Sequence, residues 1–254
     1  GCLPMLVDLL GQGNTAVGYQ AGLDVTSGNV DAFGSNALRS NSTGIFNVAV
    51  GREAAYSTTT ADYNIAIGYQ SLYTNVTGYQ NIAIGKQAFY NSTGGRESIA
   101  IGTEAGYGNT TGDLNTYIGW RAGYANQTGV QNVIVGGDAF KSSSTNASYN
   151  TGIGKNVLRN ASGNYNTAMG YQALYSNTSG TRNIAIAPFS VDACTSGNYN
   201  IGIGYASLSS LTTANYNISI GDASGGSVTT GVNNVFVGAS AGNQTSTGLR
   251  NTAV

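Results

Sequence analysis

A five-residue phrase, Asn-x-Ala-Ile-Gly or a close variant, recurs along the chain from Asn14 at an almost constant spacing. Its final glycine stands at Gly18, Gly34, Gly51, Gly68, Gly85, Gly102, Gly119, Gly136, Gly154, Gly170, Gly204, Gly221 and Gly238. Ala187 takes the place of this glycine between Gly170 and Gly204. Successive spacings are 16, 17 or 18 residues, and most are 17. A repeat this short predicts a solenoid, because each repeat can bury its apolar side chains only against its neighbours.

The repeat covers nearly the whole chain of 254 residues. We expect residues 14–254 to form one β-solenoid repeat domain and residues 1–13 to be an N-terminal lead or cap segment. Positions are numbered within each repeat from the asparagine, so that the glycine is position 5. Positions 2 and 4 are mostly β-branched, as in Ile65 and Ile67, whereas position 3 is small, as in Ala66. In a strand these two sets of side chains point to opposite faces.

The alternation predicts a β-branched core from positions 2 and 4. The glycine at position 5 is expected to end the strand, because a corner there needs a positive φ or a close backbone approach. A second strand is predicted through position 8, which is small as in Ala88, and position 9, which is often large as in Phe89. A turn rich in Asn, Ser, Thr and Gly follows. The predicted fold is therefore all-β, a parallel β-solenoid or β-roll of about fourteen 17-residue coils with two strands per coil.

A single roll of this kind has a thin core. Each coil supplies two or three large apolar groups at roughly 1.5–3 kcal/mol apiece, whereas ordering each residue costs on the order of 1–2 kcal/mol. Association of several rolls would offset the deficit, and the small residues at positions 3 and 8 would permit close approach. We therefore expect a homo-oligomer.

The composition argues against several classes of function. The net charge is −1 and the ten basic residues are spread thinly, so a nucleic-acid partner is not expected. The chain has no histidine, which is the commonest general base and metal ligand in proteins. Carboxylates do not recur with the period, as calcium-binding repeats would require. No apolar run approaches the roughly 20 residues of a membrane span. We expect no enzyme activity, no metal, no cofactor and no membrane span in this chain.

The two cysteines, Cys2 and Cys194, are expected to be unpaired. About ten coils separate them, or roughly 50 Å at ~4.8 Å per coil, which is too far for a disulfide within one chain.

The asparagine at position 1 predicts a ladder of amides, in which each side chain donates to the next carbonyl. The predicted structural ladder contains Asn47, Asn64, Asn81, Asn115, Asn132, Asn166, Asn183 and Asn200. Ser98 interrupts this series.

A ladder of tyrosines occupies position 10, at Tyr56, Tyr73, Tyr90, Tyr107 and Tyr124. These rings are candidates for glycan contact through their faces, or they stack on one another or on a neighbouring chain. A shorter set directly precedes the asparagine, at Tyr149, Tyr165, Tyr199 and Tyr216, and has the same two interpretations.

The turns carry N-x-Ser/Thr triplets in a shared phase. The candidate glycosylation sites are Asn41, Asn75, Asn91, Asn109, Asn126, Asn160 and Asn177. Modification would line one ridge with glycans. Turn composition alone also generates such triplets, so both interpretations stay open.

The phrase at residues 64–68 and 81–85, NIAIG in both, resembles the head repeats of trimeric autotransporter adhesins. The longer form at residues 166–177, NTAMGYQALYSN, is similar to repeats in fibre proteins of phages and large viruses. The resemblance covers residues 14–254. It implies a left-handed parallel β-roll, three chains packed about a common axis, and display on a bacterial surface or a virion.

The leading hypothesis is a non-enzymatic extracellular structural or adhesive fibre protein that self-associates, with a host surface glycan or protein as its partner. One alternative is a phage or viral tail or surface fibre. Another is a subunit of a head-to-tail extracellular filament, since Val254 lies within a repeat phrase and an open coil end could accept another subunit.

Overall fold

The computed structural model describes residues 13–26, 28–143 and 146–254, which fall into two compact units on either side of Thr128 and Gly129. The first unit contains β1 (Thr15–Val17), β2 (Asp31–Phe33), β3 (Val48–Val50), β4 (Ile65–Ile67), β5 (Ile82–Ile84), β6 (Ile99–Ile101) and β7 (Thr116–Ile118). The second contains β8 (Val133–Val135), β9 (Thr151–Ile153), β10 (Thr167–Met169), β11 (Ile184–Ile186), β12 (Ile201–Ile203), β13 (Ile218–Ile220), β14 (Val235–Val237) and β15 (Thr252–Ala253). The described residues hold no helix. The predicted lead segment lies almost wholly outside them.

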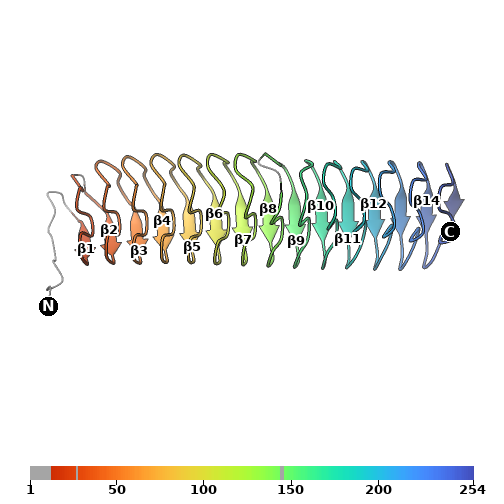
Figure 1. The fold of residues 1–254 in the computed structure, drawn as a ribbon, viewed down its shortest axis with the longest axis horizontal. Coiled ribbons are helices and arrows are strands. Elements are labelled where there is room, and N and C mark those ends of the chain that lie inside the picture. Colours follow the sequence, from red (N-terminus) through yellow and green to blue (C-terminus); the bar gives the residue numbers. More distant parts are fainter. Residues whose placement is uncertain (1–12, 27, 144–145) are drawn as a thin grey trace. The chain divides into compact units, whose positions relative to one another are not determined.

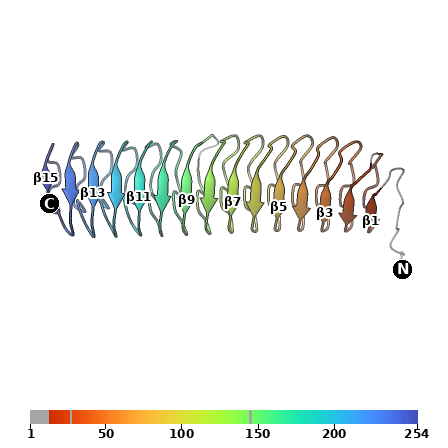
Figure 2. The same ribbon diagram turned by 180° about the vertical axis from the view of Figure 1, so that it is seen from behind.

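Within each unit, neighbouring strands pair in parallel and join equal positions of successive repeats. Ala66 lies opposite Ala83 in the first unit, and Ile184 lies opposite Ile201 in the second. Figure 1 shows the strands of each unit side by side in chain order, and Figure 2 shows the same order from behind. The predicted all-β parallel solenoid is therefore confirmed.

The predicted distribution of side chains between the inside and the outside of the coil is wrong. The small residues at position 3 face the interior: Ala66, Ala83 and Ala100 are fully buried. Ile67 and Ile101, at position 4, are 37% and 36% exposed to solvent. The interior is narrow, because a Cβ added to Gly152 at position 3 would lie only 3.1 Å from Leu158 Cδ1 at position 9. The isoleucines of positions 2 and 4 therefore lie on the outer face, and small residues occupy position 3 in most coils, with the fully buried Ile134 as an exception.

Position 9 adjusts to the residue at position 3. Tyr117, the one tyrosine at position 3 of the first unit, is fully buried. The position-9 residues beside it are glycines, and a Cβ on Gly106 would lie 2.9 Å from Tyr117 Cδ2. The second unit repeats this arrangement, with a Cβ on Gly225 lying 3.0 Å from Phe236 Cδ2. An aromatic side chain at position 3 thus occurs with glycine at position 9, whereas the smaller Ile134 shares its coil with the buried Phe140.

The predicted second strand is also wrong. Positions 7 and 9 have left-handed φ values, as in Gln70 at 55° and Leu72 at 48°. The backbone N–H groups of positions 7 and 9 therefore point toward opposite neighbouring coils. Gln70 N donates to Arg52 O of the preceding coil at 3.1 Å, and Leu72 N donates to Ala88 O of the following coil at 3.0 Å. The segment remains hydrogen-bonded between coils without forming a strand.

The corner glycines satisfy both predicted requirements. Their φ values lie between 123° and 141°. A Cβ on Gly68 would meet Gly85 O of the next coil at 2.6 Å. Only a residue without a side chain tolerates both the conformation and the close approach.

Candidate interaction surfaces

The position-1 asparagines form a hydrogen-bonded ladder inside each unit. Asn64 donates to Asn47 Oδ1 through its backbone N–H at 2.9 Å and through Nδ2 at 3.2 Å. Its Nδ2 also donates to Gly78 O at 2.9 Å. Asn183 repeats this pattern with Asn166 Oδ1 and, at 2.7 Å, with Gly197 O. All eight predicted ladder residues are buried. The amides thus serve the framework of the coil and are not available to a ligand.

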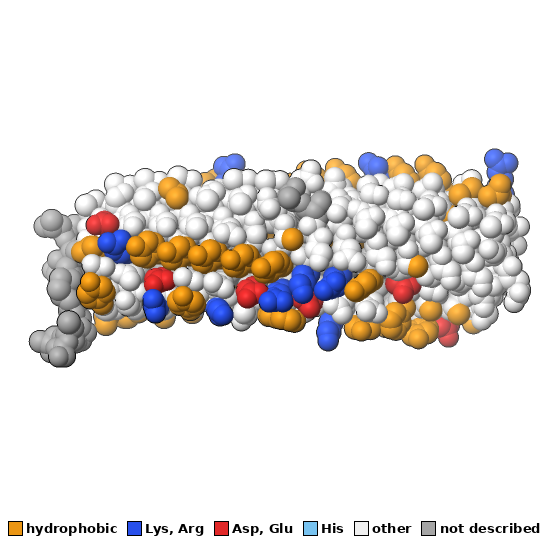
Figure 3. Space-filling model, viewed as in Figure 1, with side chains coloured by type: hydrophobic (Ala, Val, Ile, Leu, Met, Phe, Trp, Pro, Cys, Tyr) orange, Lys and Arg blue, Asp and Glu red, His pale blue; other side chains and the backbone are white. Residues whose placement is uncertain are grey.

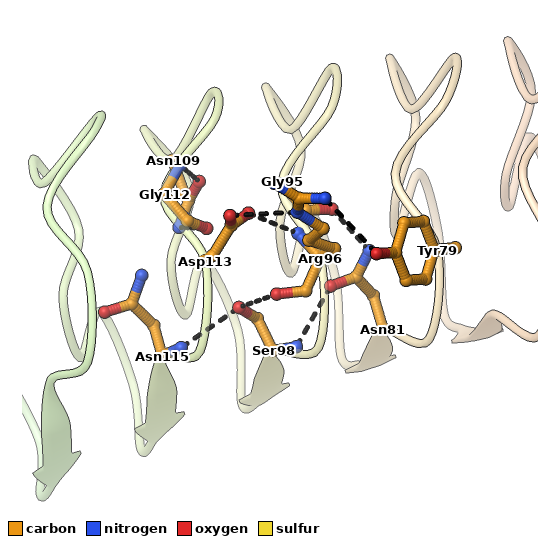
Figure 4. A network of polar contacts seen from close by, with 9 residues as sticks. All are labelled: Tyr79, Asn81, Gly95, Arg96, Ser98, Asn109, Gly112, Asp113 and Asn115. Atoms are coloured by element: carbon orange, nitrogen blue, oxygen red, sulfur yellow. Dashed lines mark hydrogen bonds and ion pairs between the residues drawn. The ribbon is translucent and has the colours of Figure 1, made fainter.

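Ser98 maintains the ladder with a shorter side chain, as Figure 4 shows. Its backbone N–H donates to Asn81 Oδ1 at 3.1 Å, and its Oγ accepts from Asn115 N at 3.0 Å. Beside it, Arg96 Nε pairs with Asp113 Oδ2 at 3.0 Å and Arg96 Nη1 donates to Tyr79 Oη at 3.2 Å. The hydroxyl therefore replaces the amide as acceptor without breaking the series.

The position-10 tyrosines of the first unit stack face to face. Ring centroids are 5.1–5.2 Å apart, with interplanar angles of 2–14°. Arg39 covers one end, donating from Nη1 to Tyr56 Oη at 2.7 Å, and the Arg121 guanidinium lies 5.7 Å from the Tyr124 centroid at the other. Figure 3 shows a continuous row of hydrophobic side chains over this unit. The rings occupy one another's faces and present their edges to solvent, so sugar rings cannot pack on the faces within the ladder.

Stacking changes the acid–base behaviour of two of these phenols. Burial raises the pKa of Tyr73, with further contributions from Tyr90 and Glu53. Burial also raises the pKa of Tyr107, and its neighbour Tyr124 adds to the effect. Each deprotonated ring would lie beside other groups that carry or acquire negative charge.

A more exposed column lies directly before the asparagine, where the second unit has four tyrosines and the first unit has the stacked pair Phe46 and Tyr63. Tyr149 and Tyr165 stack at 4.8 Å, and Tyr199 and Tyr216 stack at 5.0 Å. Arg182 lies between the two pairs, 5.2 Å from the Tyr165 centroid and 5.4 Å from that of Tyr199. Its Nη1 also donates to Tyr199 Oη at 2.9 Å. A cation thus continues the stack where a ring is missing.

Most candidate glycosylation sites lie inside the turn. Five of these asparagines are 0–1% exposed: Asn41, Asn75, Asn109, Asn126 and Asn177. Asn75 shows why, since its Nδ2 donates to Gly78 O at 2.9 Å and its Oδ1 accepts from Gly78 N at 3.0 Å. A glycan on these five is incompatible with the fold. Asn91 and Asn160 are half-buried.

An apolar stripe, defined as the first and last residues of β1–β14, covers the outer face of the strands. These are two residues from each of fourteen strands, 28 in all, of which 23 are apolar and only Asp31 is charged. Exposed fractions include 38% for Val50, 47% for Met169 and 39% for Ile220. Sequence reasoning placed these residues in the core, because alternation alone does not say which face is inside.

The described residues offer few other reactive or metal-binding groups. They hold no group of three or more His, Cys, Asp or Glu side chains that could bind a metal ion. Cys194 is a free, buried thiol in the turn position that Asn75 occupies elsewhere, and burial raises its pKa to about 11. Cys2 lies outside the described residues. In the part of the chain that is described, no helix is long and apolar enough to cross a membrane.

The fold and its surfaces define the chain as a parallel β-solenoid repeat protein. Comparison with protein-family models, with curated proteins and with solved structures returns no match. The functional argument therefore depends on the geometry of the chain.

Proposed function

We propose that this chain is a non-enzymatic structural and adhesive fibre protein whose copies associate through the apolar stripe into a parallel trimer. The observation that carries the proposal is the stripe itself. In both units it presents partly exposed isoleucine, valine and methionine side chains on successive strands, with β2 alone contributing Asp31 and Phe33 instead.

The stripe is too large to be ordinary surface. Contiguous apolar patches beyond a few hundred Å² mark interaction sites in soluble proteins. A standard interface uses roughly 20–30 residues on each side, and the stripe supplies 14 from each unit by itself. Each Å² removed from water contributes about 25 cal/mol. Burial of the stripe is therefore a substantial source of stability for a coil whose interior is mostly alanine.

The periodicity of the stripe favours a second copy of this chain as the occupant. Its side chains recur once per coil, at ~4.8 Å along the axis. A partner whose side chains interdigitate over many coils needs the same period, and another copy aligned in parallel has it. The near absence of charge removes the repulsion that would otherwise oppose such self-pairing.

The resemblance of residues 64–68 to adhesin head repeats supports three copies and a position on the outside of a cell or virion. An assembly of this kind presents its remaining columns outward many times over. Repetition converts weak individual contacts into avid attachment, which suits adhesion to a host glycan or protein.

The test measures the mass of the full chain in solution by light scattering. The wild type should have three times the mass of one chain. A variant carrying Ile67→Glu and Ile101→Glu should fall to the mass of one chain, because paired carboxylates in the interface would be desolvated. Its circular dichroism should be unchanged, since both side chains lie on the outer face.

Thr111→Glu serves as the matched control. It introduces a carboxylate of the same sign of charge in the same unit, at an exposed turn residue away from the strands. It should leave the mass of the assembly unchanged. A wild-type chain that is monodisperse and monomeric would contradict the proposal.

A further inference from the structure

The second unit carries an aromatic cluster at the coil that lacks its corner glycine. Ala187 occupies that corner with φ 103°, and Pro188 and Phe189 follow. Tyr171 and Tyr205 occupy position 6 in the coils before and after Pro188. We call Tyr171, Pro188, Phe189 and Tyr205 the aromatic platform.

The rings of the platform are arranged differently from those of the tyrosine ladder. Phe189 stands nearly perpendicular to both tyrosines, with centroids 5.4 Å from Tyr171 at 85° and 5.8 Å from Tyr205 at 82°. The two tyrosines, which are two coils apart, contact Phe189 and do not stack on one another. Tyr171 remains 42% exposed and Tyr205 55% exposed. The platform therefore offers aromatic surface that the ladder buries between its own rings.

The backbone holds the platform in place. Phe189 has a left-handed φ of 58°, and its N–H donates to Tyr171 O at 3.0 Å. Pro188 O accepts from Ala206 N of the next coil at 3.1 Å. The hydrogen bonds between coils thus continue through the altered corner, so the rings lie on an ordered support that lowers the entropic cost of binding.

The spacing of the tyrosines matches a carbohydrate chain. Tyr171 and Tyr205 are two coils apart, or about 9.6 Å at ~4.8 Å per coil, which is close to the length of two β-linked pyranose units. The apolar CH face of a pyranose packs on an aromatic ring, while its hydroxyls need polar partners at the rim. Lys155 and Asp222, both exposed, extend the position-6 column by one coil at either end and supply such partners.

The platform does not have the character of a self-association surface. The same column in the first unit contains Ser35, Arg52 and Lys86 among its residues, so it has no apolar period. The aromatic residues of this column in the first unit, Tyr19, Tyr69 and Trp120, stand in separate coils, whereas the second unit groups its rings in three consecutive coils. A ligand of two to three sugar units fits this length, whereas a second copy of the chain would repeat along every coil.

From these observations we infer that the aromatic platform binds a β-linked glycan chain, with one pyranose on Tyr171 and a second on Tyr205. The inference rests on the proposed function for its adhesive role, and it names the class of ligand. It does not require the trimer, because all contributing residues belong to one unit of one chain.

The experiment titrates the full chain with cellohexaose, chitohexaose and xylohexaose by calorimetry, and with α-linked maltohexaose for comparison. At least one β-linked probe should bind, and maltohexaose should bind at least tenfold more weakly. Tyr171→Ala and Tyr205→Ala should each weaken that binding at least tenfold. Tyr69→Ala is the matched control, because Tyr69 is a position-6 tyrosine of the first unit that is 40% exposed. It should leave binding unchanged.

Mass measurements on the same samples separate this inference from the proposed function. A monomeric wild type that still binds the glycan would contradict the trimer and leave the platform intact. An intact assembly that binds none of the three β-linked probes would overturn the platform. Equal losses of glycan binding in Tyr69→Ala and Tyr171→Ala would also overturn it. A fall in the mass of the assembly caused by Tyr171→Ala would do the same, because the platform would then be a contact between subunits.

Discussion

The two units share one coil design and distribute their aromatic side chains differently among the same surface columns. In the first unit position 10 holds five consecutive stacked tyrosines such as Tyr90, whereas in the second unit Tyr175 is the one tyrosine at that position. The second unit's rings lie before the asparagine, as in Tyr165, and at position 6, as in Tyr205, where they are 49% and 55% exposed. The inner framework of asparagine, glycine and alanine is the same in both. The comparison teaches that surface columns vary independently of the framework that supports them.

This difference predicts a division of roles. Rings that stack on one another over several coils contribute to the stability of the unit that contains them. Rings that are half exposed and held apart are available for contacts with other molecules. Four measurements would sharpen or break this comparison.

The largest effect is expected from emptying the core. Tyr117→Ala in the first unit and Phe236→Ala in the second should each lower the free energy of unfolding by about 3–5 kcal/mol. Both rings are fully buried between position-9 glycines that cannot refill the space. Urea denaturation with hydrogen exchange resolved along the chain would show the loss in the mutated unit. A loss in one unit alone would break the equivalence of the two cores.

The asparagine ladder should be more sensitive to substitution at Asn183 in the second unit than at Asn64 in the first. Asn64→Ala should cost about 2 kcal/mol and Asn183→Ala about 3 kcal/mol, within the range for unsatisfied buried groups. Gly78 O keeps a hydrogen bond from Asn75 Nδ2 at 2.9 Å, whereas Gly197 O keeps only the Cys194 thiol at 3.7 Å. The midpoints of urea unfolding would rank the two variants. Equal losses would show that the second carbonyl partner is unimportant.

Alkaline pH should destabilise the units over different ranges. Burial raises the pKa of Cys194 from 9.0 to about 11. Between those values the unfolded chain loses the thiol proton and the folded chain keeps it, so stability falls as pH rises, by about 2 kcal/mol. The raised pKa values of Tyr73 and Tyr107 act in the same direction above pH 10.

Hydrogen exchange at pH 8, 9.5 and 10.5 would locate these losses. The second unit should weaken first, and Cys194→Ser should abolish the early phase. Tyr73→Phe with Tyr107→Phe should reduce the later loss in the first unit. A first unit that weakens below pH 10 would contradict the assignment to phenols.

The smallest effect concerns the altered corner. Ala187→Gly should stabilise the second unit by about 1 kcal/mol, because alanine at φ 103° is strained where glycine is not. Ala185→Gly is the control, since Ala185 faces the core and lies in a strand. It should destabilise by about 1 kcal/mol. Thermal unfolding would measure both, and a destabilising Ala187→Gly would show that the corner is relaxed as it stands.

Much of the architecture can be predicted from the sequence. The spacing of the phrase predicts the solenoid, the asparagines predict the ladder from Asn64 to Asn81, and Gly68 predicts the corner. Each follows from a local requirement: a period, an amide that must be satisfied, or a φ that only glycine adopts. The positions of Ile67 and Ala66 relative to the core were predicted wrongly, because alternation defines two faces without saying which one is enclosed.

The candidate sites likewise combine features that the sequence predicts with features that only the tertiary structure decides. The column of Tyr56 to Tyr124 can be identified from spacing, but the ring faces are hidden because neighbouring coils bring the rings to stacking distance. The triplet at Asn75 satisfies the rule for a surface modification, yet the turn folds its amide inward to bind Gly78. The signal for the aromatic platform was the lost glycine at Ala187, whereas its perpendicular rings depend on three coils meeting in space.

The sequence by itself determines the period, the parallel register and the corner of every coil, because these depend on residues within one repeat. Only the tertiary structure decides which side chains are enclosed and which ring faces remain open. The reason is the width of the closed coil: in most coils it admits a small side chain at position 3 and one larger side chain at position 9. The isoleucines of positions 2 and 4 are therefore left on the outer face.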